Sequence, residues 1–279
     1  MRFSVGCQLP YRVITPTTMI LNLEPLRGEQ QHIVNEHFTV TPFIATEPHQ
    51  ATETGNRYRR LMLPPGDYTI RYDGEVEITP SMQEPGSIGE IPIRDLPLEV
   101  LPYLYPSRFC QSDRLGRFAW REFGVIATGH ERVTAVCNWI YENVDYLGGS
   151  SDSSTSAHDT FTLRAGVCRD FAHLGVSFCR ALGIPARFVS AYGWQLEPQD
   201  FHAVFEAYLG GRWYLFDATR LCPIDAIVRI GVGRDAADTS FATFYGQVEG
   251  GPNQVWVTPI DGAGQGADWT TEAVSVARI

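Results

Sequence analysis

The stretch TLRAGVCRDFAHLGVSFCRALGIPARF, residues 162–188, decides how the second half of this chain folds. From residue 168 onward, its apolar and small side chains recur at the spacing of one helical face: Phe171, Leu174, Gly175, Phe178 and Leu182. Gly183 and Pro185 then supply a helix stop signal. The pattern therefore predicts a helix that begins at or just before Cys168.

A thiol at a helix start meets free backbone N–H groups and the positive end of the helix dipole, which favour the thiolate form of Cys168. Ala165 and Gly166 just upstream are small enough to let another backbone or a peptide substrate approach. Cys179 lies about 20° around the helix and about 16 Å along it, which predicts a buried, inert thiol that cannot bridge to Cys168. His173 lies about 140° around the helix from Cys168, so we interpret it as a surface histidine.

The stretch FHAVFEAYLGGRWYLFDATR, residues 201–220, has two apolar runs around Gly210-Gly211, a signal for a two-residue hairpin loop. With that loop, His202 and Asp217 are diagonal neighbours on one face, with Cα atoms roughly 5.5–8 Å apart. A loop one residue longer would place them on opposite faces. In the first register the carboxylate can accept the imidazole N–H, so with Cys168 the chain offers a nucleophile, a base and an orienting acid.

Residues 1–80 alternate short apolar stretches with turn signals every eight to twelve residues, which indicates antiparallel strands in a small sandwich. Within them GDYTIRYDGEVEI, residues 66–78, predicts a hairpin that turns at Asp73-Gly74. We interpret residues 1–80 as an accessory β domain.

Residues 81–107 have a proline every few positions, which opposes regular helix and sheet, and we interpret them as a linker. Residues 108–279 then form the predicted catalytic domain. Its first helical signal is an apolar stripe over residues 133–144.

The composition excludes several classes of partner. The chain has 279 residues and a net charge of −10, and its 22 basic residues are all arginine. The acidic balance without a basic run opposes nucleic acid and anionic membranes as partners. No run of 18 apolar residues occurs and the start MRFSVGCQLP lacks a signal-peptide pattern, so we expect a cytoplasmic protein. Six scattered cysteines without a CxxC motif indicate free thiols and no structural zinc site.

A family resemblance rests on the stretches AGVCRDFAHLGVSFCRALGIPARFVSAYG (165–193) and DFHAVFEAYLGGRWYLFDATR (200–220). They resemble the transglutaminase-like superfamily of papain-type folds, in the bacterial branch described as cysteine proteases. The stretches PYLYPSRFC (102–110) and GRDAAD (233–238) are also similar to that branch. The resemblance implies an α+β fold, with a papain-like core preceded by an antiparallel, sandwich-like β domain.

Carried to this sequence, the resemblance implies that Cys168 is the nucleophile, His202 the general base and acid, and Asp217 the orienting residue. The backbone N–H of Cys168 would be half of an oxyanion hole. Tyr146 is a candidate for the other half, unless it packs in the core instead. Arg234 and Asp235 would shape the cleft or form a structural turn.

The expected function is hydrolysis of an amide or peptide through a thioester at Cys168, with a peptide, protein or small amide as substrate and no cofactor. The runner-up is transfer of the acyl group to an amine. The absence of lysine is compatible with protection from self-crosslinking, although codon usage in a GC-rich genome explains it without selection on activity.

Two further hypotheses are a non-catalytic binding module and a metal site built from Cys168, His202 and Asp217. The polar segment 147–160 is either a solvated loop or a loop over the site. The sequence leaves the oligomeric state open.

Overall fold

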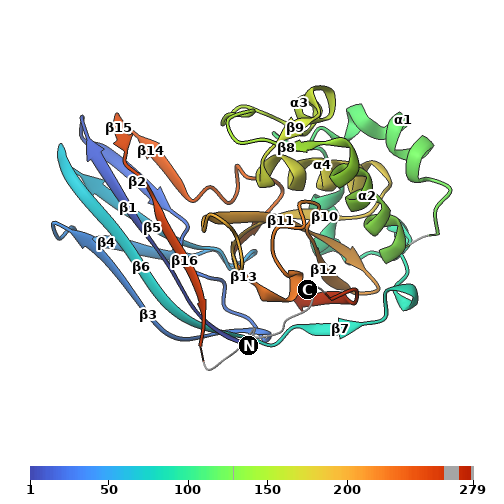
Figure 1. The fold of residues 1–279 in the computed structure, drawn as a ribbon, viewed down its shortest axis with the longest axis horizontal. Helices are drawn as coiled ribbons and strands as arrows, with labels where there is room; N and C mark the ends of the chain where they lie inside the picture. The colour runs from blue at the N-terminus through green and yellow to red at the C-terminus, as the bar shows by residue number, and fades with distance from the viewer. Residues whose placement is uncertain (128, 261–269, 278–279) are drawn as a thin grey trace.

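Two antiparallel sheets packed face to face build the first part of the molecule (Figure 1). The computed structural model describes residues 1–127, 129–260 and 270–277. The first sheet contains β15 (Val248–Gly250), β1 (Arg2–Val13), β6 (Gly66–Ile78) and β3 (Gln31–Thr41), with β16 (Gln254–Pro259) also paired to β1. The second contains β14 (Ala242–Tyr245), β2 (Thr17–Leu21), β5 (Arg57–Leu63) and β4 (Thr46–Gln50).

Alternating residues of the two sheets form one apolar core, as expected for strands with one buried face. On β1 these are Phe3, Val5, Cys7 and Leu9. The prediction of a sandwich-like β domain is therefore confirmed.

The predicted hairpin at Asp73-Gly74 is wrong, because β6 continues unbroken from Gly66 to Ile78 and pairs with β1 along its length. Every second residue of β6 from Tyr68 to Ile78 is buried, so its two halves face the same core. Gly74 serves a close approach here, since a Cβ would lie 2.5 Å from the Tyr72 hydroxyl. Long-range pairing overrides the local turn signal.

In the described residues, a six-stranded antiparallel sheet and four α-helices build the second part. The strand order is β13 (Ile227–Gly233), β10 (Ala186–Gly193), β11 (Phe201–Leu209), β12 (Arg212–Phe216), β17 (Ala273–Ala277) and β7 (Ser81–Gln83). The helices gather on one side of the sheet (Figure 1). They are α1 (Ser112–Phe123), α2 (His130–Asn143), α3 (Ala157–Leu163) and α4 (Cys168–Ala181).

Both helices expected from the apolar spacing are present, as α2 and α4. Helix α4 packs directly on β11, where a Cβ at Gly175 would lie 2.4 Å from the Phe205 ring. This close approach fixes the start of α4 relative to the strand that carries His202.

The proline-rich segment is packed against the core sheet. It contains β7 and three 3-10 helices, Pro85–Ser87, Ile93–Asp95 and Leu98–Leu104. Its Leu96 and Val100 share a buried cluster with Trp213. The expectation that proline opposes a strand here is wrong for β7, which pairs with β17. A fourth 3-10 helix, Ile224–Ala226, precedes β13.

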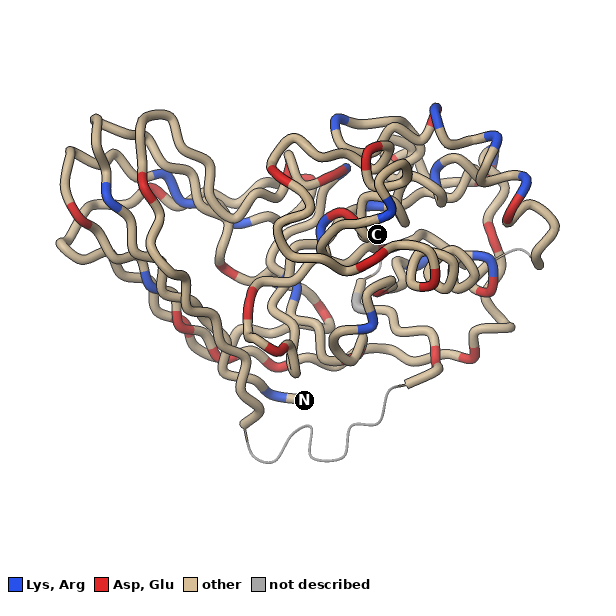
Figure 2. The backbone as a smooth tube through the Cα atoms, turned by 45° about the horizontal axis from the view of Figure 1, so that its top comes forward, with Lys and Arg blue, Asp and Glu red and all other residues tan. Residues whose placement is uncertain are grey.

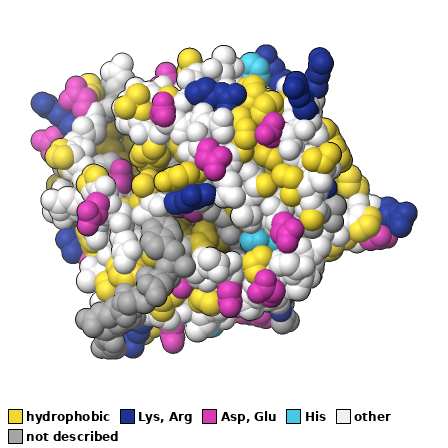
Figure 3. All heavy atoms as spheres, turned by 45° about the vertical axis from the view of Figure 1, so that its right-hand side comes forward, with side chains coloured by type: hydrophobic (Ala, Val, Ile, Leu, Met, Phe, Trp, Pro, Cys, Tyr) yellow, Lys and Arg dark blue, Asp and Glu magenta, His cyan; other side chains and the backbone are white. Residues whose placement is uncertain are grey.

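Strands β14, β15 and β16 return to the sandwich sheets after the core sheet is built, so strand pairing crosses the boundaries predicted at residues 80 and 107. Those boundaries stay predictions. Acidic and basic residues are interspersed over both parts (Figure 2). On the face drawn in Figure 3, hydrophobic side chains also gather between the charged ones. Over the residues that the structure describes, none of the helices has the length and apolar character needed to cross a membrane.

Candidate active site

The nucleophile candidate Cys168 is the first residue of α4, as the spacing predicts, and it is half-buried. Asp170 caps this helix start, because its carboxylate accepts the Val167 N–H at 2.9 Å. Gly166 is needed beside it, since a Cβ would lie 2.7 Å from the Cβ of Asp170. The short strands β8 (Asp145–Tyr146) and β9 (Ala165–Gly166) pair in parallel and bring residues 145–146 to the strand that leads into α4.

The predicted hairpin forms with the predicted loop. Leu209 pairs with Arg212, and both loop glycines have positive φ, 54° and 87°. His202 Nε2 lies 2.8 Å from Asp217 Oδ2, and both side chains are buried. The other carboxylate oxygen accepts the Thr219 N–H at 2.8 Å and the Thr219 hydroxyl at 2.7 Å. Asp217 is therefore held on two sides and fixes the imidazole ring.

The surroundings of His202 and Asp217 favour the charged form of each side chain. Burial by itself lowers the pKa of His202, but the Asp217 charge, the Cys222 thiol and the hydrogen bond with Asp217 together hold that pKa well above its ordinary value. A hydrogen bond with the Cys168 thiol acts in the same direction. Burial raises the pKa of Asp217, yet His202 and Thr219 leave it below its usual range. Because Asp217 occupies Nε2, Nδ1 is the ring atom left for the thiol.

Tyr146 packs against a neighbouring aromatic ring and also lies beside Cys168. Its ring packs on Phe171, with centroids 5.7 Å apart, while about half of the side chain stays exposed. Burial first and the Cys168 thiol second raise the pKa of Tyr146 to about 12, and a hydrogen bond from the Cys168 N–H opposes them. The tyrosine hydroxyl and the Cys168 N–H thus lie together, and the role of Tyr146 as an oxyanion donor stays a prediction.

A cavity of about 300 Å³ opens beside Cys168 and His202. Its walls come from β10, β11, the loop before α1 and the segment 236–242 that leads from β13 into β14. No sequence pattern signals this cavity, because residues up to 133 positions apart meet in it, from Phe109 to Ala242.

The polar segment after β8 covers the site. Ser153 lines the cavity, Arg169 binds the Asp152 carbonyl, and the Ser151 hydroxyl donates to Asp170. The interpretation as a loop over the site therefore fits the structure better than that of a solvated loop.

The turn after β13 places its two charged residues differently. Asp235 is buried and accepts the Phe109 and Ala237 N–H groups, each at 2.9 Å, so it supports the cavity wall. Arg234 is exposed and pairs with Asp238.

The interpretation of His173 as a surface residue is wrong, because its side chain is fully buried. It lies between the rings of Phe109 and Phe188, with centroids 5.2 Å and 4.9 Å away. Its Nε2 accepts the Ala236 N–H at 3.1 Å. Helix α4 is covered on this side by the loop before α1 and by the turn after β13, which the helical spacing alone does not reveal.

The hypothesis of a metal site meets a different set of residues in the structure. Among the described residues, the group whose ligand atoms lie within 4.8 Å of one another is His202, Asp217 and Cys222, without Cys168. Its His202 and Asp217 already bind each other, and burial raises the pKa of the Cys222 thiol, which opposes the thiolate that a metal requires. These groups fit a hydrogen-bonded pair better than a metal centre.

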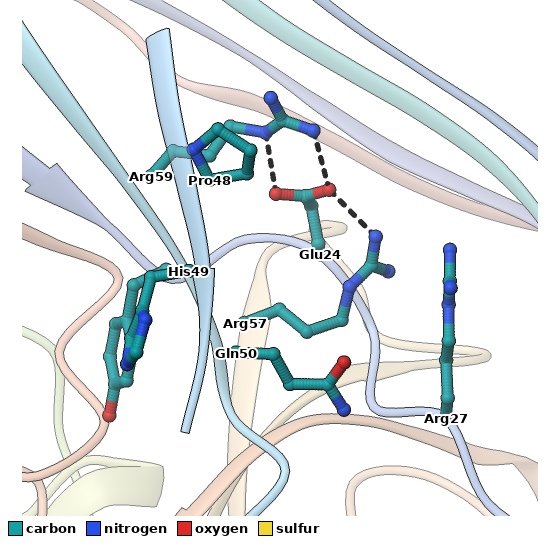
Figure 4. Close-up of a pocket in the computed structure, with 8 residues that line it drawn as sticks. Glu24, Arg27, Pro48, His49, Gln50, Arg57 and Arg59 are labelled. Atoms are coloured by element: carbon teal, nitrogen blue, oxygen red, sulfur yellow. Dashed lines mark hydrogen bonds and ion pairs between the residues drawn. The ribbon is translucent and has the colours of Figure 1, made fainter. Parts of the chain in front are cut away.

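A second cavity, of about 190 Å³, lies in the sandwich (Figure 4). Arg57 donates to Glu24 at 2.9 Å and to Glu36 at 2.7 Å, and Arg59 donates to Glu24 at 2.6 Å. Arg27 also pairs with Glu36, at 2.7 Å. These guanidinium groups hold the loop after β2 against β5, a structural task.

Comparison with known proteins agrees with this architecture. The family model described as "Transglutaminase-like superfamily" matches residues 122–218, and that described as "Bacterial transglutaminase, N-terminal domain" matches residues 1–99. A crystal structure described as "a Putative Cysteine Protease from Cytophaga hutchinsonii" is 41% identical and superposes with a TM-score of 0.93. That match covers 99% of this chain and 98% of the other.

Curated relatives match over shorter regions. An uncharacterized protein of Mycobacterium leprae is 35% identical over 128 residues, which are 41% of this chain and 45% of that protein. One of Mycobacterium tuberculosis is 42% identical over 53 residues, 19% of this chain and 17% of that protein. The chain therefore matches less than half the length of these curated relatives.

Proposed function

This chain belongs to the transglutaminase-like superfamily, and from that premise we propose that it is a thiol-dependent amide hydrolase with Cys168 as nucleophile. The observation that carries the proposal is the helix-start thiol beside a buried imidazole that is fixed by a carboxylate. The substrate in this proposal is a peptide, a protein or a small amide, and the compartment is the cytoplasm. The six cysteines, all free, are compatible with that compartment.

In the proposed reaction the Cys168 thiolate attacks the amide carbonyl, and its backbone N–H and the Tyr146 hydroxyl stabilise the oxyanion. The His202 imidazolium gives its proton to the leaving nitrogen as the C–N bond breaks, and a thioester remains. His202 then takes a proton from water, whose oxygen attacks the thioester and releases the acid and the thiolate. Asp217 holds the ring and stabilises the imidazolium in both halves.

Transfer to an amine is the second candidate, and the absence of lysine from the chain favours it. A thioester partitions between acceptors according to their local concentration and orientation. Crosslinking would therefore need a groove that delivers an amine. A binding module without activity is less favoured, because Cys168, His202 and Asp217 are all present.

The first experiment profiles a library of peptides and small amides with wild type and with Cys168→Ala. We expect acid products from the wild type alone. A second series adds rising concentrations of a primary amine and follows acid and amide products by mass spectrometry. Mostly amide at low millimolar amine would replace the hydrolase with the transferase, and equal turnover by Cys168→Ala would remove both.

A further inference from the structure

Aromatic rings form the walls of the cavity beside Cys168. Four of them line it: Phe109, Phe188, Phe201 and Phe241. Phe201 and Phe241 are stacked, with centroids 4.0 Å apart and planes 22° apart, so β11 and the segment before β14 make one continuous wall. Alanines rather than larger side chains fill the remaining apolar positions. The volume of about 300 Å³ lies at the lower end of ligand pockets, which suits one side chain.

The cavity also contains a buried hydroxyl that has no hydrogen-bond partner in the described part of the chain. Thr239 is 2% exposed and lines the cavity. Its methyl carbon lies beside Gly233, where a Cβ would come within 3.1 Å of it. Ser190 also lines the cavity, and its hydroxyl makes only a 3.5 Å contact with the Gly231 carbonyl. A ligand hydroxyl would satisfy these groups.

None of the described residues that line the cavity beside Cys168 offers a charge without a partner. Its ionisable members are Cys168, His202 and Arg169. His202 is bound to Asp217, and Arg169 is bound to Asp170 and to the Asp152 carbonyl. A charged substrate side chain would therefore lose its hydration without gaining a partner.

We propose that this cavity binds a tyrosine side chain of the substrate next to the amide bond that reacts at Cys168. The inference rests on the proposed function and names its substrate class. Phenyl walls bind an aromatic ring by stacking and edge contacts, and the phenol can both donate to and accept from Thr239. Phenylalanine or leucine would leave that hydroxyl unpaired, which a site of this kind rejects.

The sandwich takes part in this pocket, because Phe241 and Ala242 belong to the segment that enters strand β14. Strand β14 pairs with β2, from Ala242 opposite Leu21 to Tyr245 opposite Thr18. The sandwich therefore fixes one wall of the substrate pocket, which gives it a role in specificity.

The test uses three alkylating reagents on the full chain: iodoacetamide, N-phenethyl iodoacetamide and N-(4-hydroxyphenethyl) iodoacetamide. Each forms a C–S bond at Cys168 and expels iodide, and each rate is divided by the rate with free cysteine to remove intrinsic reactivity. We expect the hydroxyphenethyl reagent to be fastest, about tenfold ahead of the phenethyl reagent, as one buried hydrogen bond provides. The phenethyl reagent should in turn exceed iodoacetamide.

Two variants at one position test the hydroxyl. Thr239→Val keeps the shape and should bring the hydroxyphenethyl and phenethyl rates together, whereas Thr239→Ser should keep them apart. Thr243→Val, on β14 outside the cavity lining, is the matched control and should leave all three rates unchanged. An unchanged ratio in Thr239→Val would overturn the assignment of the hydroxyl.

The outcomes separate the two proposals. If Cys168 reacts with iodoacetamide no faster than the buried thiols, the proposed function fails. If Cys168 is the fastest thiol but the three reagents react alike, the function stands and the tyrosine pocket is overturned.

Discussion

At the scale of single residues, six cysteines differ in what surrounds them. Burial raises the pKa of Cys7 to about 11 and of Cys110 to about 12, and it raises those of Cys137, Cys179 and Cys222 as well. Cys168 alone is half-exposed and lies beside the imidazole. We therefore expect iodoacetamide near neutral pH to label Cys168 first, as peptide mapping would show. Earlier labelling of Cys7 or Cys222 in the folded protein would contradict the assignment.

The variant Asp217→Asn should show whether Asp217 acts by orienting the His202 imidazole or only by filling space. The amide keeps the size of the carboxylate but favours the wrong imidazole tautomer, so turnover should fall by roughly 10³–10⁴-fold with little loss of fold. Asp73→Asn, on β6 far along the chain from the site, is the matched control and should retain activity. A loss below tenfold in Asp217→Asn, measured with the substrate found in the library, would contradict the role given to the hairpin.

The same variant should move the pH profile. Asp217 holds the pKa of His202 above its ordinary value, so the imidazolium that protonates the leaving group is lost only as the pH rises through that raised pKa. Without the carboxylate, burial lowers the pKa, and the alkaline limb of kcat should shift to lower pH. An alkaline limb that stays in place would show that another group sets it.

At the scale of elements, Asp170 links the start of α4 to the loop above it. Asp170→Ala removes the acceptor for the Val167 N–H and for the Ser151 hydroxyl, at a cost of about 1 kcal/mol for the cap. Hydrogen exchange should rise in residues 147–155 and 165–168 while the rest of α4 stays protected. Asp159→Ala removes the equivalent cap of α3 at Ser156 and should loosen α3 instead. Uniform exchange along α4 would contradict this local role.

The helices and strands also show which parts of the structure could be predicted from the sequence. Helix α4 and the β11–β12 hairpin follow from spacing and from a Gly-Gly loop, because local geometry alone determines where Cys168, His202 and Asp217 lie in their elements. The prediction for β6 failed because its pairing with β1 outweighs an Asp-Gly turn signal. Thr239 and the buried His173 have no local signal, since their surroundings are assembled from distant segments.

At the scale of the whole molecule, two side-chain amides join the sandwich to the edge of the core sheet. Asn56 accepts the Val232 N–H and donates to the Val232 carbonyl, both at 2.9 Å. Gln31 accepts the Arg229 N–H and donates to its carbonyl, also both at 2.9 Å. Both amides thus act as a short extra strand along β13. They cover an edge that would otherwise expose backbone groups, and they fix the sandwich beside the substrate cavity.

Removing these amides should therefore weaken the whole chain and not the sandwich alone. Asn56→Leu removes the acceptor of the Val232 N–H and the donor to the Val232 carbonyl. Gln31→Leu removes the acceptor of the Arg229 N–H, whereas the Arg229 carbonyl keeps the Leu26 N–H at 2.9 Å. Each buried group that loses its partner costs about 1–3 kcal/mol. We expect Asn56→Leu to lose roughly 2–4 kcal/mol and Gln31→Leu roughly 1–3 kcal/mol of unfolding free energy, measured in urea. Asn35→Leu removes an amide whose bond to Glu75 is exposed, so its effect should stay within about 0.5 kcal/mol.

The same unfolding curves can show whether the joint couples the two parts. Fluorescence and far-UV circular dichroism should give coincident transitions in the wild type, because burial of β13 depends on both parts. In the double variant the midpoint should fall further and the two signals should separate, since the sandwich and the core sheet then lose a shared edge. If the double variant instead unfolds at the wild-type midpoint, the two amides do not hold the molecule together, and another contact must fix the wall that Phe241 forms beside Cys168.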